Sequence, residues 1–202
     1  MSRREIFAAF RAAKEEVFNE VPERIGILDG ICDDFGIPRD EVPKTGGLEA
    51  SENCAALIAK WEGMAKKLPD GRFKAYPDPA TGGVPWTIGV GSTGPDIGPD
   101  TVWTREQCLQ RFHRDLAHFA HKVAELIGDA PTTQGQFDAM TSLAYNIGVG
   151  AFGGSTLLRM HKAGDHDGAE AEFQRWDKAG GKVLQGLRAR RWDEARVYGG
   201  KA

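Results

Sequence analysis

The sequence has few cysteines, no excess of positive charge and no long hydrophobic run. Its 202 residues include only three cysteines, Cys32, Cys54 and Cys108, an odd number without paired CxxC spacing. Such a set predicts neither a disulfide framework nor a zinc site, so we expect reduced cysteines that pack in the core, and no metal or cofactor. The net charge of −3 lacks the broad positive field with which nucleic-acid-binding proteins attract phosphates, so no nucleic-acid partner is expected.

The N-terminal residues carry a charge every few positions. Residues 1–20 therefore contain neither the uninterrupted apolar segment of a signal peptide nor a membrane span. We expect a protein made in the cytoplasm, without stable membrane insertion. What is present is an ordinary globular composition, with 41% hydrophobic and 27% charged residues, which can form a core and fold.

Helical periodicity and turn residues divide the chain into two parts. Residues 1–48 predict an N-terminal helical extension that ends in a linker rich in proline and glycine. Residues 49–202 predict the main domain. Within it, Ser51 is a candidate N-cap of a helix whose apolar residues recur at three- and four-residue spacing as far as Leu68. Glu62 lies at the flank of that apolar stripe.

A short hairpin follows the first helix of the main domain. The Pro69-Asp70-Gly71 turn breaks the helix, and the apolar pattern then changes to the period of two that is typical of strands. Residues 73–76 predict one strand and residues 86–91 another, joined by a turn that contains Asp78. On the second strand, bulky residues alternate with small ones, which leave one face open to a ligand or to another backbone. These small residues are Thr87, Gly89 and Gly91.

The chain after Thr104 is predicted to be wholly helical. Thr104 with Gln107, and Thr133 with Gln136, form capping-box patterns that open two helices. Shorter helices follow near residues 155–163, 167–178 and 186–198. The prediction is an α+β fold, mainly α, in which a cleft separates a small β-hairpin lobe from a larger helical lobe.

The predicted cleft contains the residue types that glycoside hydrolysis requires. One carboxylic acid must protonate the leaving oxygen, and a second carboxylate must act as base or nucleophile. Glu62 and Asp78 are candidates for this pair. Each residue also has an ordinary explanation, because a glutamate within a helix is usually solvated and an aspartate before a proline often forms a turn.

A series of motifs runs through the main domain in a fixed order. The first three are Trp61-Glu62-Gly63, Lys74-Ala75-Tyr76-Pro77-Asp78-Pro79 and Gly83-Val84-Pro85-Trp86-Thr87-Ile88-Gly89. The later ones include Gln136-Phe137-Asp138-Ala139, Tyr145-Asn146-Ile147-Gly148, Ser155-Thr156-Leu157-Leu158, Trp176, and Gly186-Leu187 with Arg190-Arg191. Together they resemble the phage-type lysozymes, glycoside hydrolase family 24, over about residues 53–198. The resemblance implies the two-lobed lysozyme-like fold.

The resemblance also implies a muramidase of the endolysin kind, which hydrolyses the β-1,4 bond between N-acetylmuramic acid and N-acetylglucosamine in bacterial peptidoglycan. The family's catalytic triad falls on Glu62, Asp78 and Thr87. Glu62 is then the general acid, and Asp78 and Thr87 hold the attacking water on the opposite sugar face, which gives inversion. We expect a monomer that serves host cell lysis and reaches the periplasm after a holin-type partner permeabilises the membrane.

Three residues near the cleft are predicted to bind the substrate. Asn146 falls where the resemblance suggests a hydrogen bond to the sugar or its N-acetyl group, and Tyr145 is expected to pack beneath it. A helix end near Gly148 explains Asn146 equally well. Gly89, on the open face of the hairpin, is the third.

A basic cluster in the last predicted helix is a further candidate for the site. It consists of Arg188, Arg190 and Arg191. One of these arginines is a candidate partner for Glu62 or for the carboxylates of peptidoglycan stem peptides, and Arg188 is assigned to substrate binding. The alternative is a solvated basic helix end, which the helix dipole favours.

Two departures from the family pattern affect the predicted site. An insertion at residues 66–71 lengthens the spacing between Glu62 and Asp78 and makes Asp70 a rival for the second carboxylate. We favour Asp78, because Asp70 lies in a Pro-Asp-Gly turn without the Tyr-x-Asp context. The second departure is Ser92, which stands where the family usually has a histidine. This replacement puts in doubt a hydrogen bond that ties the hairpin to the helical lobe.

Two other functions are compatible with the same sequence. A noncatalytic peptidoglycan-binding protein could keep the lysozyme-like fold, although the intact set of Glu62, Asp78 and Thr87 argues against this. A phage structural component with an attached lysozyme domain would give residues 1–48 a role in delivery. The charge of this segment, roughly −3, provides no attraction to an anionic wall. We therefore expect the segment to pack against the helical lobe.

Overall fold

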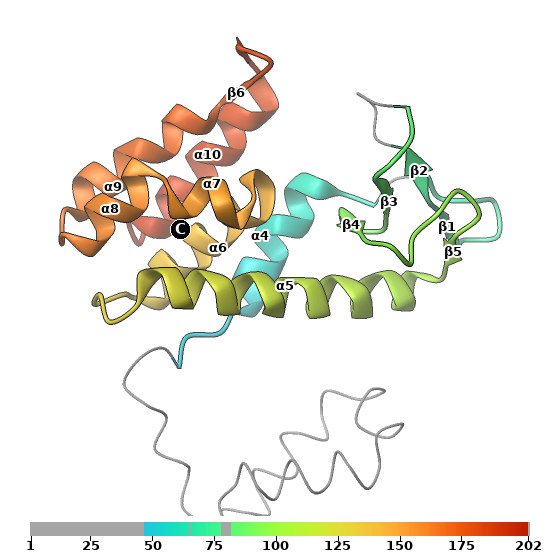
Figure 1. Ribbon diagram of the computed structural model, residues 1–202, viewed down its shortest axis with the longest axis horizontal. Helices are drawn as coiled ribbons and strands as arrows, with labels where there is room; N and C mark the ends of the chain where they lie inside the picture. The colour runs from blue at the N-terminus through green and yellow to red at the C-terminus, as the bar shows by residue number, and fades with distance from the viewer. Residues whose placement is uncertain (1–46, 65, 78–81, 202) are drawn as a thin grey trace, which may run out of the picture. The chain divides into compact units, whose positions relative to one another are not determined.

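The structure is a computed structural model that describes residues 47–64, 66–77 and 82–201. Almost all of the predicted extension, residues 1–48, lies outside this part of the chain, so its helices, its packing and its boundary stay predictions. In the described residues, a small β lobe and a larger helical lobe are connected by two helices (Figure 1). The predicted α+β fold, mainly helical and two-lobed, is confirmed.

Helix α4, Glu52–Glu62, begins where the sequence predicts but ends earlier. The Ser51 side chain caps it by accepting a hydrogen bond from the Cys54 N–H. The helix stops at Gly63, whose φ of 65° lies in the left-handed region that glycine adopts at little cost. The predicted continuation to Leu68 is therefore wrong, and Glu62 becomes the last residue of the helix.

The insertion after Glu62 forms a small hairpin at the edge of the β lobe. The Leu68 N–H donates to the Arg72 carbonyl at 2.7 Å, and Lys67 forms a β-bridge with Phe73. The Asp70 side chain closes the predicted turn, because it accepts hydrogen bonds from the Arg72 backbone and guanidinium. These pairings replace the last helical turns that the apolar spacing predicted.

Short antiparallel strands make up the rest of the β lobe. They are β1 (Phe73–Lys74) paired with β5 (Val102–Trp103), and β2 (Tyr76–Pro77), β3 (Trp86–Ile88) and β4 (Ser92–Thr93) in that order. The predicted strand at 73–76 is thus divided between two sheets. The predicted strand at 86–91 ends at Ile88, because Gly89 and Gly91 adopt positive φ angles and turn the chain.

The register of β2 and β3 sorts their side chains onto two faces. Tyr76 lies opposite Thr87, and Pro77 lies opposite Trp86. Residues directly opposite each other in an antiparallel pair share a face, and successive residues alternate. Tyr76 and Thr87 therefore lie on one face of the hairpin, and Pro77 and Trp86 lie on the other.

Gly89 packs against helix α5, Arg105–Ile127. A Cβ atom at Gly89 would lie only 2.8 Å from the Cys108 Cβ, and the φ of Gly89 is +63°. The sequence predicted that either a ligand or another backbone approaches the open face of the hairpin. At Gly89 it is helix α5 that approaches, which explains why this residue is a glycine. The assignment of Gly89 to substrate binding stays a prediction.

Helix α6, Gln134–Ile147, forms the centre of the helical lobe. It is capped by Thr133 with Gln136, as α5 is by Thr104 with Gln107, so both predicted capping boxes are confirmed. Every residue of α6 from Gln136 to Ala144 is buried. The helices around it are α7 (Val149–Gly153), α8 (Thr156–Lys162), α9 (His166–Glu172), the 3₁₀ helix η1 (Phe173–Trp176) and α10 (Gln185–Tyr198).

One further hairpin interrupts the region that was predicted to be wholly helical. Strands β6, Lys178–Ala179, and β7, Lys182–Val183, pair around Gly180 and Gly181, which both have positive φ.

A separate observation concerns membranes. Among the described residues, the structure contains no helix with the length and apolarity needed to cross a bilayer.

His161 is a buried titratable residue in the helical lobe. Its side chain is 1% exposed, with its ring nitrogens 2.8 Å from the Thr132 hydroxyl and 2.7 Å from the Tyr198 hydroxyl. Burial, assisted by the nearby His166, lowers the pKa of His161 from 6.5 to about 4. The folded protein therefore keeps this ring neutral at pH values where a solvated histidine is protonated.

We expect the free energy of unfolding to decrease as the pH falls from about 6.5 to about 4. In this window the unfolded chain binds a proton at residue 161 and the folded chain does not, whereas above it both states are neutral and the contribution is complete. The loss should reach roughly 3 kcal/mol, measured by urea unfolding at successive pH values. His161→Gln should remove this part of the pH dependence, and the exposed control His121→Gln should keep it. Equal slopes in all three proteins would contradict the assignment.

Candidate active site

Glu62 lies where the two lobes meet. Its side chain is 23% exposed, so water or a ligand can reach the carboxyl group. On the side of the β lobe, Gly91 lies against it, and a Cβ atom at Gly91 would be 3.3 Å from Glu62 Oε2. On the side of the helical lobe, Arg190 of α10 donates from Nη1 to Glu62 Oε1 at 2.6 Å. The carboxyl group is therefore held between a glycine turn and an arginine.

The face of the hairpin that carries Thr87 also carries Tyr76. Thr87 is half-buried in β3 and lies opposite Tyr76. Burial raises the pKa of Tyr76, and the negative charge of Glu62 raises it further. Tyr76 therefore shares the electrostatic surroundings of Glu62. Thr87, on the same face as Tyr76, belongs to the same part of the molecule.

The second carboxylate has two candidates. Asp78 lies outside the described residues, so its assignment stays a prediction. Asp70 lies in its turn and forms an ion pair with Arg72 at 2.7 Å. Hydrogen bonds from Arg72 lower the pKa of Asp70. Because Asp70 already has a charged partner, its geometry gives no reason to prefer it over Asp78.

A buried ion network extends from Glu62 into the helical lobe. Arg190 donates from Nε to Glu194 Oε1 at 3.1 Å, and Arg191 Nε lies 3.2 Å from Glu194 Oε2. The Ser142 hydroxyl also donates to Glu194, at 2.7 Å. One carboxylate thus holds two arginines, of which Arg190 reaches Glu62.

Burial makes this network sensitive to the loss of any member. The side chains of Arg191 and Glu194 are 0% exposed, and that of Arg190 is 4% exposed. Burial raises the pKa of Glu194, against the lowering effect of the two arginines, and burial lowers the pKa of Arg191. With Glu62, two carboxylates face two guanidinium groups. Removing one charge would leave another buried and unpaired, which is strongly destabilising.

The structure separates the roles of the two predicted binding residues of α6. Tyr145 packs against Phe112 and Phe119, and its hydroxyl donates to the Val90 carbonyl at 2.8 Å. Burial raises its pKa far above the usual range. Asn146 is exposed, and its Oδ1 accepts a hydrogen bond from Arg191 Nη2 at 2.7 Å. Tyr145 therefore supports the β3–β4 turn, whereas Asn146 remains accessible.

Arg190, from the basic cluster of α10, is the ion-pair partner of Glu62. The sequence predicted such a partner as one of two alternatives for this cluster. Arg188, which the sequence assigned to substrate binding, instead forms an ion pair with Asp177 at 3.1 Å, with its side chain 52% exposed. Its predicted substrate contact would have to compete with this pair. The i,i+4 spacing of Arg190 and Glu194 was the sequence signal that could have identified the network.

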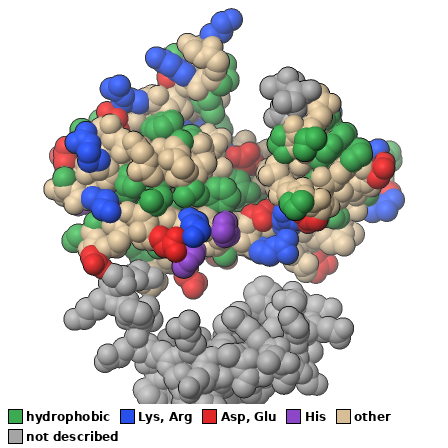
Figure 2. Space-filling view, in the orientation of Figure 1, with side chains coloured by type: hydrophobic (Ala, Val, Ile, Leu, Met, Phe, Trp, Pro, Cys, Tyr) green, Lys and Arg blue, Asp and Glu red, His purple; other side chains and the backbone are tan. Residues whose placement is uncertain are grey.

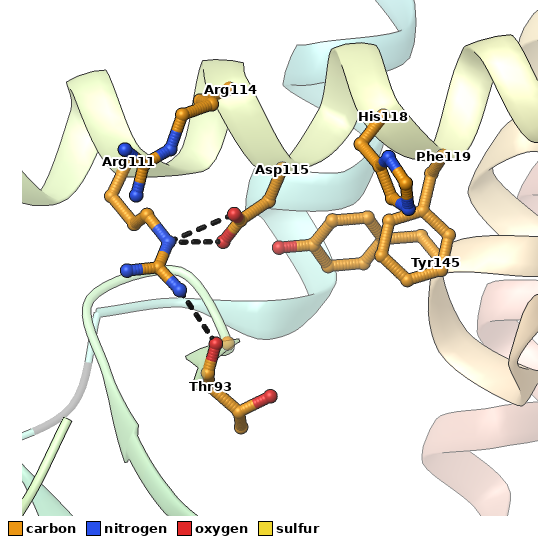
Figure 3. A pocket seen from close by; sticks show the side chains of 8 residues that line it. Thr93, Arg111, Arg114, Asp115, His118, Phe119 and Tyr145 are labelled. Atoms are coloured by element: carbon orange, nitrogen blue, oxygen red, sulfur yellow. Dashed lines mark hydrogen bonds and ion pairs between the residues drawn. The ribbon is translucent and has the colours of Figure 1, made fainter. Parts of the chain in front are cut away.

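Arg111 supplies the polar link between the β lobe and α5. Its guanidinium donates to the Asp115 carboxylate at 2.8 and 3.1 Å and to the Thr93 carbonyl at 2.7 Å (Figure 3). A further bond reaches Asp96 at 2.5 Å. Ser92 itself is buried, and the polar contact between β4 and α5 is made by Arg111 to the Thr93 carbonyl.

Comparison with known proteins agrees with this architecture. The family model described as phage lysozyme matches residues 59–194. The endolysin of Bacillus phage PZA is 38% identical over 151 residues, which cover 75% of this chain and 55% of the relative. The endolysin of Acyrthosiphon pisum secondary endosymbiont phage 1 is 37% identical over 155 residues, covering 75% of this chain and 98% of the relative.

A solved structure shows the same fold. The endolysin from Escherichia coli O157:H7 phage FAHEc1 superposes with a TM-score of 0.64 at 34% identity, covering 76% of this chain and 95% of that protein. This chain therefore spans nearly the whole length of some relatives. It spans about half the length of the Bacillus phage endolysins that it matches.

Replacing Glu194 tests whether it holds the network. Glu194→Gln keeps the volume but leaves two buried arginines with less negative charge, so the free energy of unfolding should fall by about 3–5 kcal/mol. Urea denaturation measures this loss. The matched control is Glu170→Gln, which breaks the partly exposed pair of Glu170 with Lys201 and should cost less than about 1 kcal/mol. Similar losses in both variants would show that Glu194 has no special role.

Proposed function

This chain belongs to the phage lysozyme family, and we propose that it is a muramidase of the endolysin kind. It hydrolyses the β-1,4 bond between N-acetylmuramic acid and N-acetylglucosamine in bacterial peptidoglycan, with inversion at the sugar carbon. The observation that carries the proposal is the position of Glu62. Its carboxyl group is solvent-accessible at the junction of the lobes and is held by Arg190.

Glu62 acts as the general acid. In the protonated form it donates its proton to the glycosidic oxygen as the bond to the leaving sugar breaks. The carboxyl group then becomes negatively charged. Arg190, at 2.6 Å, stabilises this charge. Because Glu194 shares Arg190, the positive charge near Glu62 is partly balanced in the resting enzyme.

Asp78 and Thr87 position the attacking water. An inverting enzyme needs a base separated from the acid by about 6.5–9.5 Å, so that water fits on the opposite face of the sugar. Thr87 shares its hairpin face with Tyr76, whose pKa is raised by burial and by the charge of Glu62, and the Thr87 hydroxyl can orient a water molecule. Asp78 follows Tyr76 by two residues in the sequence, and the proposal assigns it the role of the base.

Substrate contacts and the biological role complete the proposal. Asn146, held by Arg191, offers its amide nitrogen to the sugar or to its N-acetyl group. The protein acts as a monomer in host cell lysis. It is made in the cytoplasm and reaches the peptidoglycan in the periplasm once a holin-type partner has permeabilised the membrane.

Glu62→Gln tests the acid. We expect the lysis of outer-membrane-permeabilised Gram-negative cells, and the release of new reducing ends, to fall by about 10²–10⁴-fold. Glu52→Gln, an exposed change in the first turn of the same helix, should keep full activity. If wild-type protein sedimented with peptidoglycan but released no reducing ends, the noncatalytic alternative would be correct. Mass spectrometry of the products should show hydrated muramic acid ends, since anhydro ends would indicate a transglycosylase.

The identity of the base is tested by two isosteric changes. Asp78→Asn should lose about 10²–10⁴-fold in lytic rate, because an amide cannot accept the proton of the attacking water. Asp70→Asn should retain most of the wild-type rate, since the Asp70 carboxylate accepts hydrogen bonds from Arg72 within its turn. An active Asp78→Asn protein beside an inactive Asp70→Asn protein would transfer the role to Asp70.

A further inference from the structure

A pocket lies on the β lobe, and Glu62 is not among the described residues that line it. It has a volume of about 490 Å³ and is formed by the insertion, by β1 and β2, by Trp86 and by Pro99 and Asp100. Pro77 and Trp86 lie on the hairpin face opposite to Thr87. The pocket therefore combines Pro77 and Trp86, from the hairpin face opposite to Thr87, with Tyr76, from the face that carries Thr87.

Three lysines surround this pocket. Lys66 and Lys67 come from the insertion and Lys74 from β1, and all three are exposed. The Lys74 N–H donates to the Lys66 carbonyl at 3.1 Å, and Lys67 bridges to Phe73, so the backbone holds the three lysines near one another. Because the insertion hairpin supplies two of them, the cluster depends on the departure from the family spacing.

The lysines are available to a ligand. Within residues 47–64, 66–77 and 82–201, none of their ammonium groups forms an ion pair, and Asp100 is the only acidic residue that lines the pocket. The described lining therefore carries three positive charges and one negative charge, although the protein as a whole has a charge of −3. A local positive field of this kind concentrates anions at short range.

The other walls of the pocket are apolar or aromatic. Trp86, Pro77 and Leu68 are half-buried and line it beside the lysines. Figure 2 shows hydrophobic side chains gathered on the β lobe, with Lys and Arg side chains at its outer edge. A tryptophan ring combines a large apolar surface with a polar edge, which suits the face of a sugar ring or a peptide. The matching ligand carries anionic groups on an uncharged, partly apolar framework.

We propose that this pocket is a secondary, noncatalytic site for peptidoglycan, in which Lys66, Lys67 and Lys74 bind carboxylates of the stem peptides and Trp86 contacts the adjoining sugar or peptide. The choice of polymer rests on the proposed function. Stem peptides are the anionic groups that muramic acid residues carry along the strands, so they recur throughout the substrate. A strand held here would raise the effective concentration of wall at Glu62 without taking part in the reaction.

Binding is measured without catalysis, in the full-length Glu62→Gln protein. Sacculi from Gram-negative cells, which carry no teichoic phosphates, are sedimented with the protein across a series of NaCl concentrations. Lys67→Gln/Lys74→Gln should weaken binding by about three- to tenfold at low salt, and the difference should vanish at high salt. The matched control is Lys178→Gln/Lys182→Gln, which removes the same charge from the exposed strands β6 and β7 and should bind as the parent does.

Two further measurements identify the ligand and separate this proposal from the muramidase assignment. After an amidase has removed the stem peptides, the parent and the Lys67→Gln/Lys74→Gln protein should bind equally, and a persisting difference would overturn the carboxylate assignment. A difference seen only with phosphate-bearing Gram-positive walls would overturn it too. In the active background, the lysine variant should cleave short soluble glycan fragments at the wild-type rate. Equal binding of all variants to intact sacculi refutes the site whatever the activity, whereas a wild-type protein that binds but cannot cleave refutes only the muramidase.

Discussion

The position of the Glu62 carboxyl group depends on another carboxylate that has no contact with solvent. Glu194 is fully buried and holds Arg190, and Arg190 in turn holds Glu62. A buried guanidinium that loses its partner is costly, so Arg190 remains where Glu194 places it. Through Arg191, the same glutamate also sets the orientation of Asn146. One face of α10 therefore organises both the proposed acid and a proposed sugar contact.

The turn between β3 and β4 provides the opposite wall of the site. Gly91 leaves space for the Glu62 carboxylate, and Gly89 leaves space for α5. The Tyr145 hydroxyl donates a hydrogen bond to the Val90 carbonyl within this turn. Arg111 of α5 donates to the Thr93 carbonyl of the following strand. These contacts come from three separate elements. Contacts with α4, α5 and α6 thus hold the turn beside the Glu62 side chain, which remains partly exposed.

The net charge of this protein does not show how its charged side chains are distributed. A total of −3 gives no reason for attraction to an anionic polymer. The two arginines near Glu62 are balanced by the buried Glu194 and by Glu62 itself, and Arg111 is balanced by Asp96 and Asp115. The lysines of the insertion have no such partners among the described residues. Electrostatic attraction to a wall therefore depends on the placement of a few side chains.

The sequence by itself determined the features that depend on near neighbours. The caps of α4, α5 and α6 join residues three apart, so the order of Ser, Thr and Gln along the chain was enough to predict them. The ordered motifs likewise identified the family and led to the prediction that Glu62 is the acid. Only the tertiary structure decided the end of α4, the division of the predicted first strand and the hairpin at Gly180 and Gly181. It also selected Arg190 from three arginines, because an ion pair across 128 positions depends on how α10 docks against α4. Such contacts form only when the whole fold brings distant segments together. A local sequence pattern gives no information about which distant residues will meet.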